Sequence, residues 1–548
     1  MKKFISTILC LLFCLFPFSS CADSFLTPDK KPAPPPQTEE KEEEEEEKTE
    51  IEVDEGNIEM GNLTPAYVFN HNMVLQRNKE VKIYGAGGLP RVEVTVEFNG
   101  QTKTTNPDKK GLWSVTLDPM EANANGQQLK IYDELTEYVF ENVVVGEVWY
   151  CSGQSNMEMH LGLALTDRGF STSGSYENSP LDDYTKYTNW DQIRFYKQKN
   201  YEATTAHRFG GVHPTYKNGW GAPNTMKDAM SFSAYATGFA LRLQEELKVP
   251  VGVIVSAVSG SSIVQWLAKE TIANNDLYLH YSNDRFGTSE FYNGMTFALN
   301  DFTVAGLLWY QGCTDSYNHQ VEYWHKDMKA FCDQFRKAHG NVPIISQMLV
   351  QHCFGADWSL IRQISVDLMS EVENFYTVNG ISAGIPYDIY PPDKSNRIHP
   401  ADKYSISKNA AEIALTNVYN LSGYNSVAES PVSVKKENNN LVINYKNGVS
   451  LKLSEGNTLN NLEGFNGNTW ETIDNATVNG NKIIVVGGSK YTKVRYANYN
   501  VMMSGATNSA NLANVIYNSE KMINLYSEKP GCDDLAVFPF REISVSAS

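Results

Sequence analysis

The feature that most constrains this fold is a change in hydrophobic rhythm that occurs twice along the chain. Between about residues 143 and 420, short apolar runs alternate with stretches whose apolar residues follow helical spacing. The apolar runs are 143–151, 251–257, 304–310 and 342–350, and the helical stretches include 233–248 and 358–372. Strands alternating with helices favour a parallel sheet covered on both faces, with the active site at the carboxyl ends of the strands. We therefore predict an α/β domain over residues 143–424.

The regions on either side of this domain show the period-two alternation typical of β-strands. Before it, residues 81–84, 92–98 and 113–117 alternate and are separated by turn signals such as Asn99-Gly100. After it, the alternation returns at 441–445, 482–486 and 493–496. We predict an N-terminal β-sandwich over residues 63–142 and a C-terminal β-rich domain over residues 425–548. A chain of 548 residues is long enough for these three folded units.

The first 21 residues have the pattern of an export signal. Met1-Lys2-Lys3 is followed by an apolar run to about Phe18 and then by Ser19-Ser20-Cys21. A charged start, a short apolar run and small residues at the cut point indicate a secretory signal, and the run is too short to span a bilayer comfortably. Cysteine after two small residues resembles the bacterial lipoprotein box, which implies lipidation at Cys21; Phe18 and Ser20 depart from it, so a simple secretory signal stays open. We expect an exported protein, lipid-anchored in the bacterial cell envelope on the periplasmic or surface side of the outer membrane.

Residues 22–62 read as a disordered linker rich in proline and acid. Twelve acidic residues and two lysines lie between Glu39 and Glu55, so this segment carries a net charge of −10 out of −18 for the chain. Such a run is typical of a solvated, self-repelling tether. The remainder has no basic patch, which argues against nucleic acid as a partner. Oligomeric state cannot be read from the sequence.

The cysteines do not form a metal-binding pattern. Five remain after residue 21, with no CxxC spacing among them, at Cys151, Cys313, Cys332, Cys353 and Cys532. An odd number without paired spacing suggests neither a zinc site nor a full disulfide framework. We predict no metal and no other cofactor.

Ser155 is the first candidate for chemistry. It follows the apolar run 143–151 in the segment Cys151-Ser152-Gly153-Gln154-Ser155, and the residues after it can begin a helix. A serine on a strand-to-helix turn exposes its hydroxyl at the sheet edge, where backbone N–H groups can face an oxyanion. The same position also suits an ordinary helix N-cap serine, so the turn alone leaves both readings open.

Several segments together resemble the sialate O-acetylesterase family, within the SGNH (GDSL-like) hydrolases. The resemblance implies a flavodoxin-like parallel-sheet domain and covers nearly everything after the linker, because segments of both flanking domains match as well. Its motifs are Gly153-Gln154-Ser155-Asn156-Met157, the block 256–266 with Gly260, Tyr292-Asn293-Gly294-Met295, Leu308-Trp309-Tyr310-Gln311-Gly312, Ile398-His399-Pro400 with Lys403, and the outlying segments 72–77, 111–115, 494–497, 524–526 and 539–541.

The resemblance implies a carbohydrate O-acetylesterase with Ser155 as nucleophile and His399 as its base. The alkoxide sugar would leave from an acetyl-enzyme that water then hydrolyses. The backbone N–H groups of Ser155 and Gly260 are the implied oxyanion donors, with the side chain of Gln311 as a third candidate and Asp315 as a substrate-binding position. The partner is an O-acetylated sugar or glycan, whose identity stays open; Trp266 is either a sugar contact or a core residue.

Two departures from the family pattern concern the base and the second signature. The position three residues before the histidine holds Asn396 where relatives carry Asp, and Asp393 could substitute if its loop folds back; otherwise the site is a Ser–His dyad. Cys313 stands where relatives carry glutamate, and Ser259 replaces a glycine. Asn396 and Cys313 support an alternative, a catalytically weakened, non-enzymatic glycan-binding surface lipoprotein.

Overall fold

The computed structural model describes most of the chain after residue 60. The described ranges are 53–54, 60–167, 181–209, 220–277, 286–317, 321, 323–349, 358–379, 399, 403–424, 427–453, 456, 458–459, 462–496, 525–528, 535–536 and 540–546. The predicted signal peptide with Cys21, most of the predicted linker, Asp393, Asn396, Cys353 and Cys532 lie outside these ranges.

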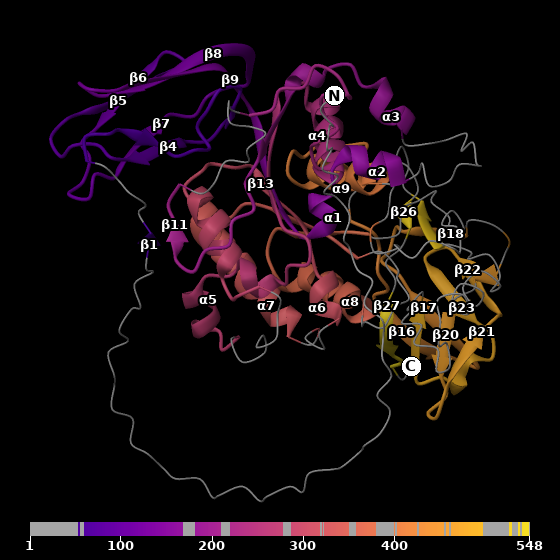
Figure 1. Cartoon of the computed structure of the whole chain (residues 1–548). Helices are drawn as coiled ribbons and strands as arrows, with labels where there is room; N and C mark the ends of the chain where they lie inside the picture. Colours follow the sequence, from indigo (N-terminus) through magenta and orange to yellow (C-terminus); the bar gives the residue numbers. More distant parts are fainter. Residues whose placement is uncertain are drawn as a thin grey trace, which may run out of the picture. The chain divides into compact units, whose positions relative to one another are not determined.

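Six parallel strands form the centre of the α/β region (Figure 1). Their order across the sheet is β10-β12-β9-β13-β14-β15. Their bounds are β9 Glu137–Gly153, β10 Ile193–Lys197, β12 Val251–Ala257, β13 Gly306–Tyr310, β14 Ile344–Gln347 and β15 Phe375–Val378. The strand order proceeds in both directions from β9, so the ends of β12 and β13 flank the end of β9. Ligands of open α/β sheets bind where the strand order reverses in this way.

Helices cover both faces of this sheet. Their bounds are α1 Ser155–Glu158, α2 Leu161–Asp167, α3 Leu181–Lys186, α4 Ala234–Leu247, α5 Lys269–Asn274, α6 Cys313–Tyr317, α7 Trp324–His339, α8 Trp358–Glu371 and α9 Lys403–Asn417. Trp149 of β9 contacts Phe239 of α4, whereas the next residue, Tyr150, stacks on Phe335 of α7. Successive residues of a strand point to opposite faces, so α4 and α7 lie on opposite sides of the sheet.

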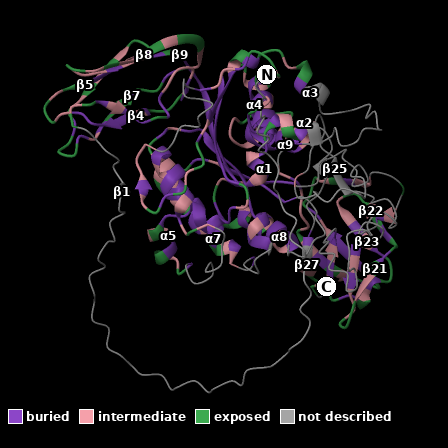
Figure 2. Cartoon of the chain, in the orientation of Figure 1, coloured by how far each residue is buried: buried purple, intermediate pink, exposed green. Residues whose placement is uncertain are grey.

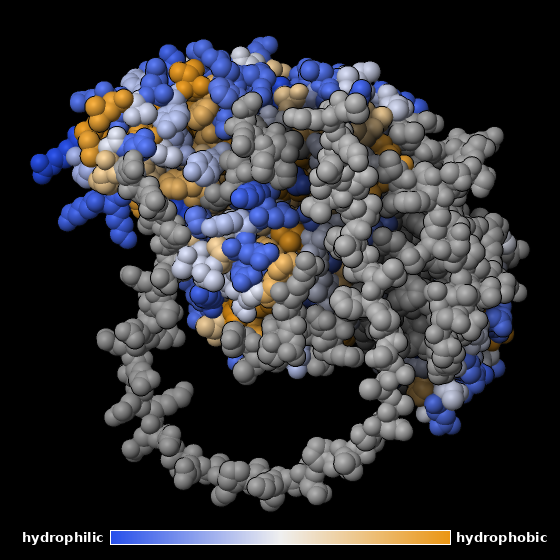
Figure 3. Space-filling view, in the orientation of Figure 1, coloured by the Kyte–Doolittle hydropathy of each residue, from blue (hydrophilic) through white to orange (hydrophobic). Residues whose placement is uncertain are grey.

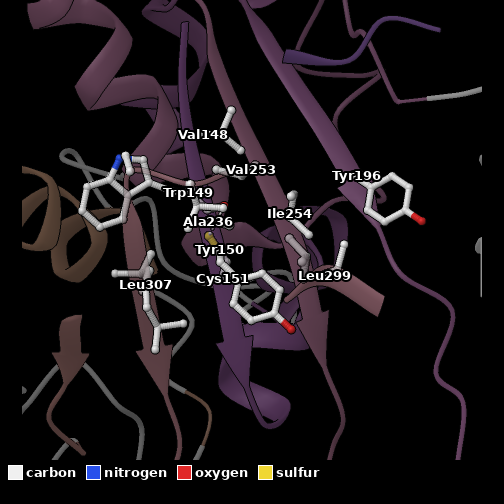
Figure 4. Close-up of a cluster of buried hydrophobic side chains, with 14 of the residues drawn as sticks. Val148, Trp149, Tyr150, Cys151, Tyr196, Ala236, Val253, Ile254, Leu299 and Leu307 are labelled. Carbon is white, nitrogen blue, oxygen red and sulfur yellow. Dashed lines mark hydrogen bonds between the residues drawn. The ribbon is translucent and has the colours of Figure 1, made fainter. Parts of the chain in front are cut away.

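The strands of the central sheet are buried (Figure 2), and the residues in its interior are mostly apolar. Figure 4 shows Val148, Trp149, Tyr150 and Cys151 of β9 among buried residues of β12 and β13. A strand buried on both faces reads as a continuous apolar run, and this explains the runs seen in the sequence. The helix predicted at 233–248 is α4, capped by Ser233, whose hydroxyl accepts a hydrogen bond from Ala236 N, and ended by Lys248 in the left-handed conformation.

The N-terminal strands are continuous with the central sheet through β9. The bounds are β2 Thr64–Pro65, β3 Val74–Gln76, β4 Val81–Ala86, β5 Val94–Phe98, β6 Gln101–Thr105, β7 Trp113–Leu117 and β8 Asn123–Tyr132. The first part of β9 pairs with β8 and β3, and its last part pairs with β12 and β13. The domain boundary predicted at residues 142 and 143 therefore falls inside one strand, and both regions share one hydrophobic core.

Two side chains of the segment 72–77 make contacts at this junction that explain their presence. Gln76 donates to the buried carboxylate of Glu147 at 3.0 Å and accepts from Val148 N at 2.8 Å. Arg77 pairs with the same carboxylate at 2.5 Å. A buried carboxylate needs such partners, so these two side chains attach β3 to β9.

The C-terminal strands are antiparallel and form a separate core. Their bounds are β16 Ser433–Glu437, β17 Asn440–Asn444, β18 Ser450–Leu453, β19 Thr458–Leu459, β20 Leu462–Phe465, β21 Trp470–Ile473, β22 Ala476–Asn479, β23 Lys482–Val485, β24 Lys493–Tyr496, β25 Leu525–Glu528, β26 Leu535–Ala536 and β27 Phe540–Ser544. Leu441, Ile443 and Ile483 lie at its centre with no exposed area. The prediction of an α/β fold with a β-rich region on each side is confirmed.

The face drawn in Figure 3 mixes hydrophilic and hydrophobic side chains over the coloured part of the chain. None of the helices in the described ranges combines the length and apolar character needed to span a bilayer.

Candidate active site

Ser155 stands directly after the central strand, at the start of α1. Gly153 ends β9 with a φ of 136°, and a Cβ on this glycine would lie 2.2 Å from the carbonyl oxygen of Tyr310. Only glycine fits this close approach. Gln154 N donates to Tyr310 O at 3.1 Å, and Val258 N donates to Gly153 O at 3.1 Å. The turn that carries Ser155 is thus held between the ends of β13 and β12.

The structure brings His399 to Ser155 across 244 positions of sequence. The imidazole Nε2 lies 2.7 Å from the Ser155 hydroxyl oxygen, and both side chains are half-buried. Burial, followed by the positive charge of Lys403, lowers the pKa of His399 from 6.5 to about 4. A neutral imidazole accepts a proton through one nitrogen, so at neutral pH His399 has the form that a general base requires.

A buried polar cluster lies beside this pair. Lys403 is 1% exposed, and its ammonium donates to Asn156 Oδ1 at 2.5 Å and lies 5.5 Å from the centroid of the Tyr310 ring. Asn156 Nδ2 contacts the sulfur of Cys313 at 3.8 Å. Burial raises the pKa of the Cys313 thiol to about 12, so it stays protonated and unreactive at neutral pH. Cys313 packs against the residue next to the nucleophile and adds no second nucleophile.

Gly260 lies in the turn that follows β12, next to the strand that ends at the nucleophile. Ala257 at the end of β12 is paired with Gly153 of β9, so the two turns start side by side. Gly260 has a φ of 80°, a left-handed value that favours glycine. Ser259 before it is exposed and Gly260 is half-buried, so this turn reaches the surface beside the nucleophile.

Gln311 and Asp315 occupy a buried network rather than the open edge of the site. Gln311 is 2% exposed; its amide nitrogen donates to a carboxylate oxygen of Asp315 and to Ser261 O at 3.2 Å. Its amide oxygen accepts from the indole of Trp324 at 3.2 Å. The amide has only two protons to donate, and these contacts engage them. The structure therefore places Gln311 as a scaffold residue and does not present it as the third oxyanion donor.

Asp315 is fully buried, and its contacts likewise differ from the predicted contact with substrate. One oxygen accepts from Gln311, and the other accepts from Ile263 N at 3.2 Å. These bonds connect the end of β13 to the 3₁₀ helix Ile263–Trp266 after β12. We assign Asp315 to positioning these two loops relative to each other.

Gln154 completes this network and was given no role by the sequence analysis. Its amide oxygen accepts from Gly312 N at 3.1 Å and Thr314 N at 3.3 Å. The residue directly before the nucleophile therefore binds the turn after β13. No local signal in the sequence indicates this contact, because its partners lie about 160 positions away.

Trp266 and the 292–295 motif prove to be structural. Trp266 has no exposed area, and its indole donates to Ser261 Oγ at 3.0 Å, so of the two readings the core position holds. Residues Tyr292–Thr296 form a π-helical turn, in which Asn293 donates to Ala203 O at 3.1 Å. A Cβ on Gly294 would lie 2.0 Å from Tyr201 O, which explains the glycine. This motif anchors the segment after β10.

Two predicted members of the site cannot be placed. Asp393 and Asn396, the candidates for the group that orients His399, lie outside the described residues. Within the ranges that the structure describes, no three His, Cys, Asp or Glu side chains gather in a way that could hold a metal ion.

Comparisons with known proteins agree with this geometry. Residues 145–389 match the family model described as carbohydrate esterase, sialic acid-specific acetylesterase. Human sialate O-acetylesterase is 26% identical over 290 residues, which cover 50% of this chain and 52% of the human protein. The mouse protein of the same name is 25% identical over 302 residues, covering 45% and 51%. The chain thus spans about half the length of the curated relatives it matches.

A solved structure shares the fold over most of the chain. A carbohydrate acetylesterase from Xanthomonas citri superposes with a TM-score of 0.70 at 21% identity, covering 88% of this chain and 99% of the other. At that identity the likeness speaks for the fold. The family match begins within β9 and covers the nucleophile turn and the turns after β12 and β13, and it ends before His399. Residues 145–389 of this chain are thus similar to the sialic acid-specific acetylesterase family of carbohydrate esterases.

Proposed function

We propose that this protein is a carbohydrate O-acetylesterase that uses Ser155 as its nucleophile and His399 as its general base. The observation that carries the proposal is the 2.7 Å contact between Ser155 Oγ and His399 Nε2 at the carboxyl edge of a parallel sheet. Serine is a poor nucleophile unless a base within hydrogen-bond reach takes its proton. In this assignment the α/β domain has the flavodoxin-like SGNH architecture, flanked by an N-terminal β-sandwich.

The reaction proceeds in two halves. His399 Nε2 accepts the proton of Ser155 as Oγ bonds to the acetyl carbonyl carbon, giving a tetrahedral oxyanion. Collapse breaks the bond from that carbon to the sugar oxygen, which leaves with the proton from His399. Water, deprotonated by His399, then attacks the acetyl carbon; the bond from that carbon to Ser155 Oγ breaks, Oγ takes the proton back from His399, and acetate is released.

The oxyanion needs hydrogen-bond donors close to Ser155. We assign this role to the backbone N–H groups of Ser155 and Gly260, which follow the paired ends of β9 and β12. Lys403, a buried residue four positions after His399, adds a positive charge to the same region. One lost donor typically lowers turnover by about 10²–10³-fold.

The substrate is an acetylated sugar. The relatives are named for sialate esters, and the solved neighbour is named a carbohydrate acetylesterase. The acetyl group is small, so most of the selectivity among sugars must come from contacts with the sugar itself. The glycan-binding alternative is not favoured, because Cys313 leaves the contact between Ser155 and His399 intact.

Export and lipid anchoring through Cys21 remain part of the proposal. Their support is the sequence of residues 1–21, with its lysines, apolar run and cysteine. Asp393 stays the candidate to orient His399 in place of the family acid, with a Ser–His dyad as the form that the site takes without it.

Hydrolysis of p-nitrophenyl acetate by wild type and Ser155→Ala tests the proposal, together with covalent labelling by a fluorophosphonate. We expect turnover and labelling in the wild type and neither in the variant, since Ser155 forms the covalent bond. Ser152→Ala is the matched control, because Ser152 is a buried serine of β9 three residues earlier. Turnover that survives in Ser155→Ala, or a folded wild type that is neither active nor labelled, would disprove the assignment.

A further inference from the structure

Glu158 is the last residue of α1, three positions after the nucleophile. It is half-buried. One oxygen of its carboxylate accepts from Ser259 N at 2.7 Å and from Ser259 Oγ at 2.6 Å. The other oxygen accepts from Asn200 Nδ2 at 3.0 Å. A single carboxylate therefore binds both polar groups of one residue and one side chain of another.

These contacts join three neighbouring strand ends. Glu158 belongs to the turn after β9, Ser259 to the turn after β12, and Asn200 to the segment after β10. Hydrogen bonds to a carboxylate are shorter and about twice as strong as bonds between neutral groups. The two bonds to Ser259 connect the turns after β9 and β12 through a side chain.

The turn after β12 is also fixed from its far side. Ser261 N donates to Val258 O at 3.3 Å, and Ser261 Oγ donates to the same carbonyl at 2.8 Å. The peptide that joins Ser259 to Gly260 therefore lies between two attachment points. The amide proton of that peptide is the one that the proposed mechanism directs at the oxyanion. A displacement of about 1 Å in such a group can cost about 10²-fold in rate.

The negative charge of Glu158 makes a purely electrostatic role implausible. A carboxylate so close to Ser155 opposes the development of an oxyanion, because like charges repel. Its contacts must therefore benefit the site through geometry. Ser259 supplies a hydroxyl that adds a second bond to this attachment.

We propose that Glu158 is a positioning residue that holds the Ser259–Gly260 turn so that the Gly260 N–H faces the oxyanion. This inference rests on the proposed esterase function and extends it to a residue outside the Ser155–His399 pair. Glu158 acts through the turn and touches neither substrate nor reacting atoms.

The test compares kcat and KM for p-nitrophenyl acetate in the full chain and in Glu158→Ala, Glu158→Gln and Ser259→Ala. We expect Glu158→Ala to lower kcat by about 10- to 100-fold with KM within about threefold, because the lost contact matters in the transition state. Glu158→Gln keeps the length and one acceptor oxygen, so it should recover part of that loss. Ser259→Ala keeps the backbone donor and should lower kcat by less than Glu158→Ala.

A double-mutant cycle checks that the two residues act together. In the Glu158→Ala background, Ser259→Ala should have no further effect on kcat, since the shared contact is already gone. Additive losses would overturn the inference. If Glu158→Ala fails to fold, Glu158→Gln and Ser259→Ala, with their double variant, carry the same comparison.

Asp228 offers a matched control. Its carboxylate accepts from Thr225 N at 3.0 Å and Thr225 Oγ1 at 2.9 Å, so it repeats the Glu158–Ser259 arrangement in a turn that supplies no residue to the site. Asp228→Asn should leave kcat within about twofold while lowering the melting temperature as much as Glu158→Gln. A Glu158→Ala kcat within about twofold of wild type, or a change confined to KM, would overturn the inference. A wild type that neither turns over nor reacts with a fluorophosphonate would instead refute the esterase proposal.

Discussion

The two turns that flank the nucleophile differ in how they are held. The turn after β12, with Ser259 and Gly260, reaches the surface and is attached through the carboxylate of Glu158. The turn after β13, with Gln311 and Asp315, is buried and attached through Gln154, Trp324 and Ile263. Both follow strands paired with β9. One turn is therefore open to a ligand, and the other forms part of the support beneath the site.

This difference distinguishes motif residues that take part in the reaction from motif residues that support the fold. Both turns belong to motifs that resemble one enzyme family, yet only the turn after β12 has an open backbone beside Ser155. The buried amide of Gln311 already makes its hydrogen bonds. If it turned toward a substrate, its present partners would be left unpaired in the interior, which costs free energy. A motif residue can thus be required to build the site without contacting the substrate or the reacting atoms.

The largest expected loss of activity is at His399, and the effects of substitutions in the two turns can be compared with it. His399→Gln should lower kcat by about 10⁴-fold or more, since the proton of Ser155 would lose its acceptor. The melting temperature should stay close to wild type, because His399 is only half-buried. Steady-state hydrolysis with a thermal melt measures both. Turnover within about tenfold of wild type would remove His399 from the mechanism.

Substitutions in the buried turn after β13 should lower the stability of the protein more than its activity. Asp315→Ala removes the acceptor for Gln311 and Ile263 N, leaving buried donors without partners. We expect a loss of about 2–4 kcal/mol in unfolding free energy, while the folded fraction keeps a kcat within a fewfold of wild type.

Urea unfolding and active-site titration measure these two quantities. Asp315→Asn keeps one acceptor oxygen and serves as the conservative control with a smaller loss. A collapse of kcat in folded Asp315→Ala would return Asp315 to the substrate-contacting role predicted from sequence.

The base that contacts Ser155, His399, should give the activity a distinct pH dependence. Because the pKa of His399 is lowered to about 4, its neutral form persists as pH falls through 6.5 and is lost only near 4. The acid limb of kcat/KM should therefore lie near pH 4. Protonation also favours the unfolded chain, whose histidines keep a pKa near 6.5, so the contribution of His399 to stability is lost between pH 6.5 and 4.

The variant Lys403→Met tests how much of the lowered pKa of His399 comes from the charge of Lys403. Removing the cation should raise the acid limb, yet keep it below 6.5, because burial is the larger cause of the lowered pKa. Profiles of kcat/KM from about pH 3.5 to about pH 8 for the wild type and for Lys403→Met measure the shift of the acid limb. A wild-type limb at 6.5 or above would contradict the expectation and indicate a carboxylate at Nδ1 of His399, as predicted for Asp393.

The smallest effect is expected at Cys313. Its thiol is buried and protonated and contacts Asn156 only weakly, at 3.8 Å. Cys313→Ala should cost about 1–2 kcal/mol of stability and change kcat by less than about threefold. Hydrolysis and urea unfolding of this variant check both values. A large loss of kcat would show that the buried turn reaches the chemistry through Asn156.

The sequence predicted much of this fold because its signals are local. The apolar runs became β9, β12, β13 and β14, and the helical stretches became α4 and α8, since period two and period 3.6 follow from backbone geometry. The alternation at 441–445 and 482–486 became β17 and β23. The shared strand β9 was missed, because a continuous apolar run does not show where one sheet region passes into the next.

By itself, the sequence determined the α/β class, the β-rich flanks and the pairing of Ser155 with His399 as candidates, the last through resemblance between motifs. Tertiary structure alone decided which motif residues meet the surface. It buried Gln311, Asp315 and Trp266, and it placed Glu158 against Ser259 across 101 positions of chain. Hydrogen-bond partners so far apart leave no periodic trace in the sequence, because their proximity arises only when neighbouring strand ends assemble at one edge of the sheet.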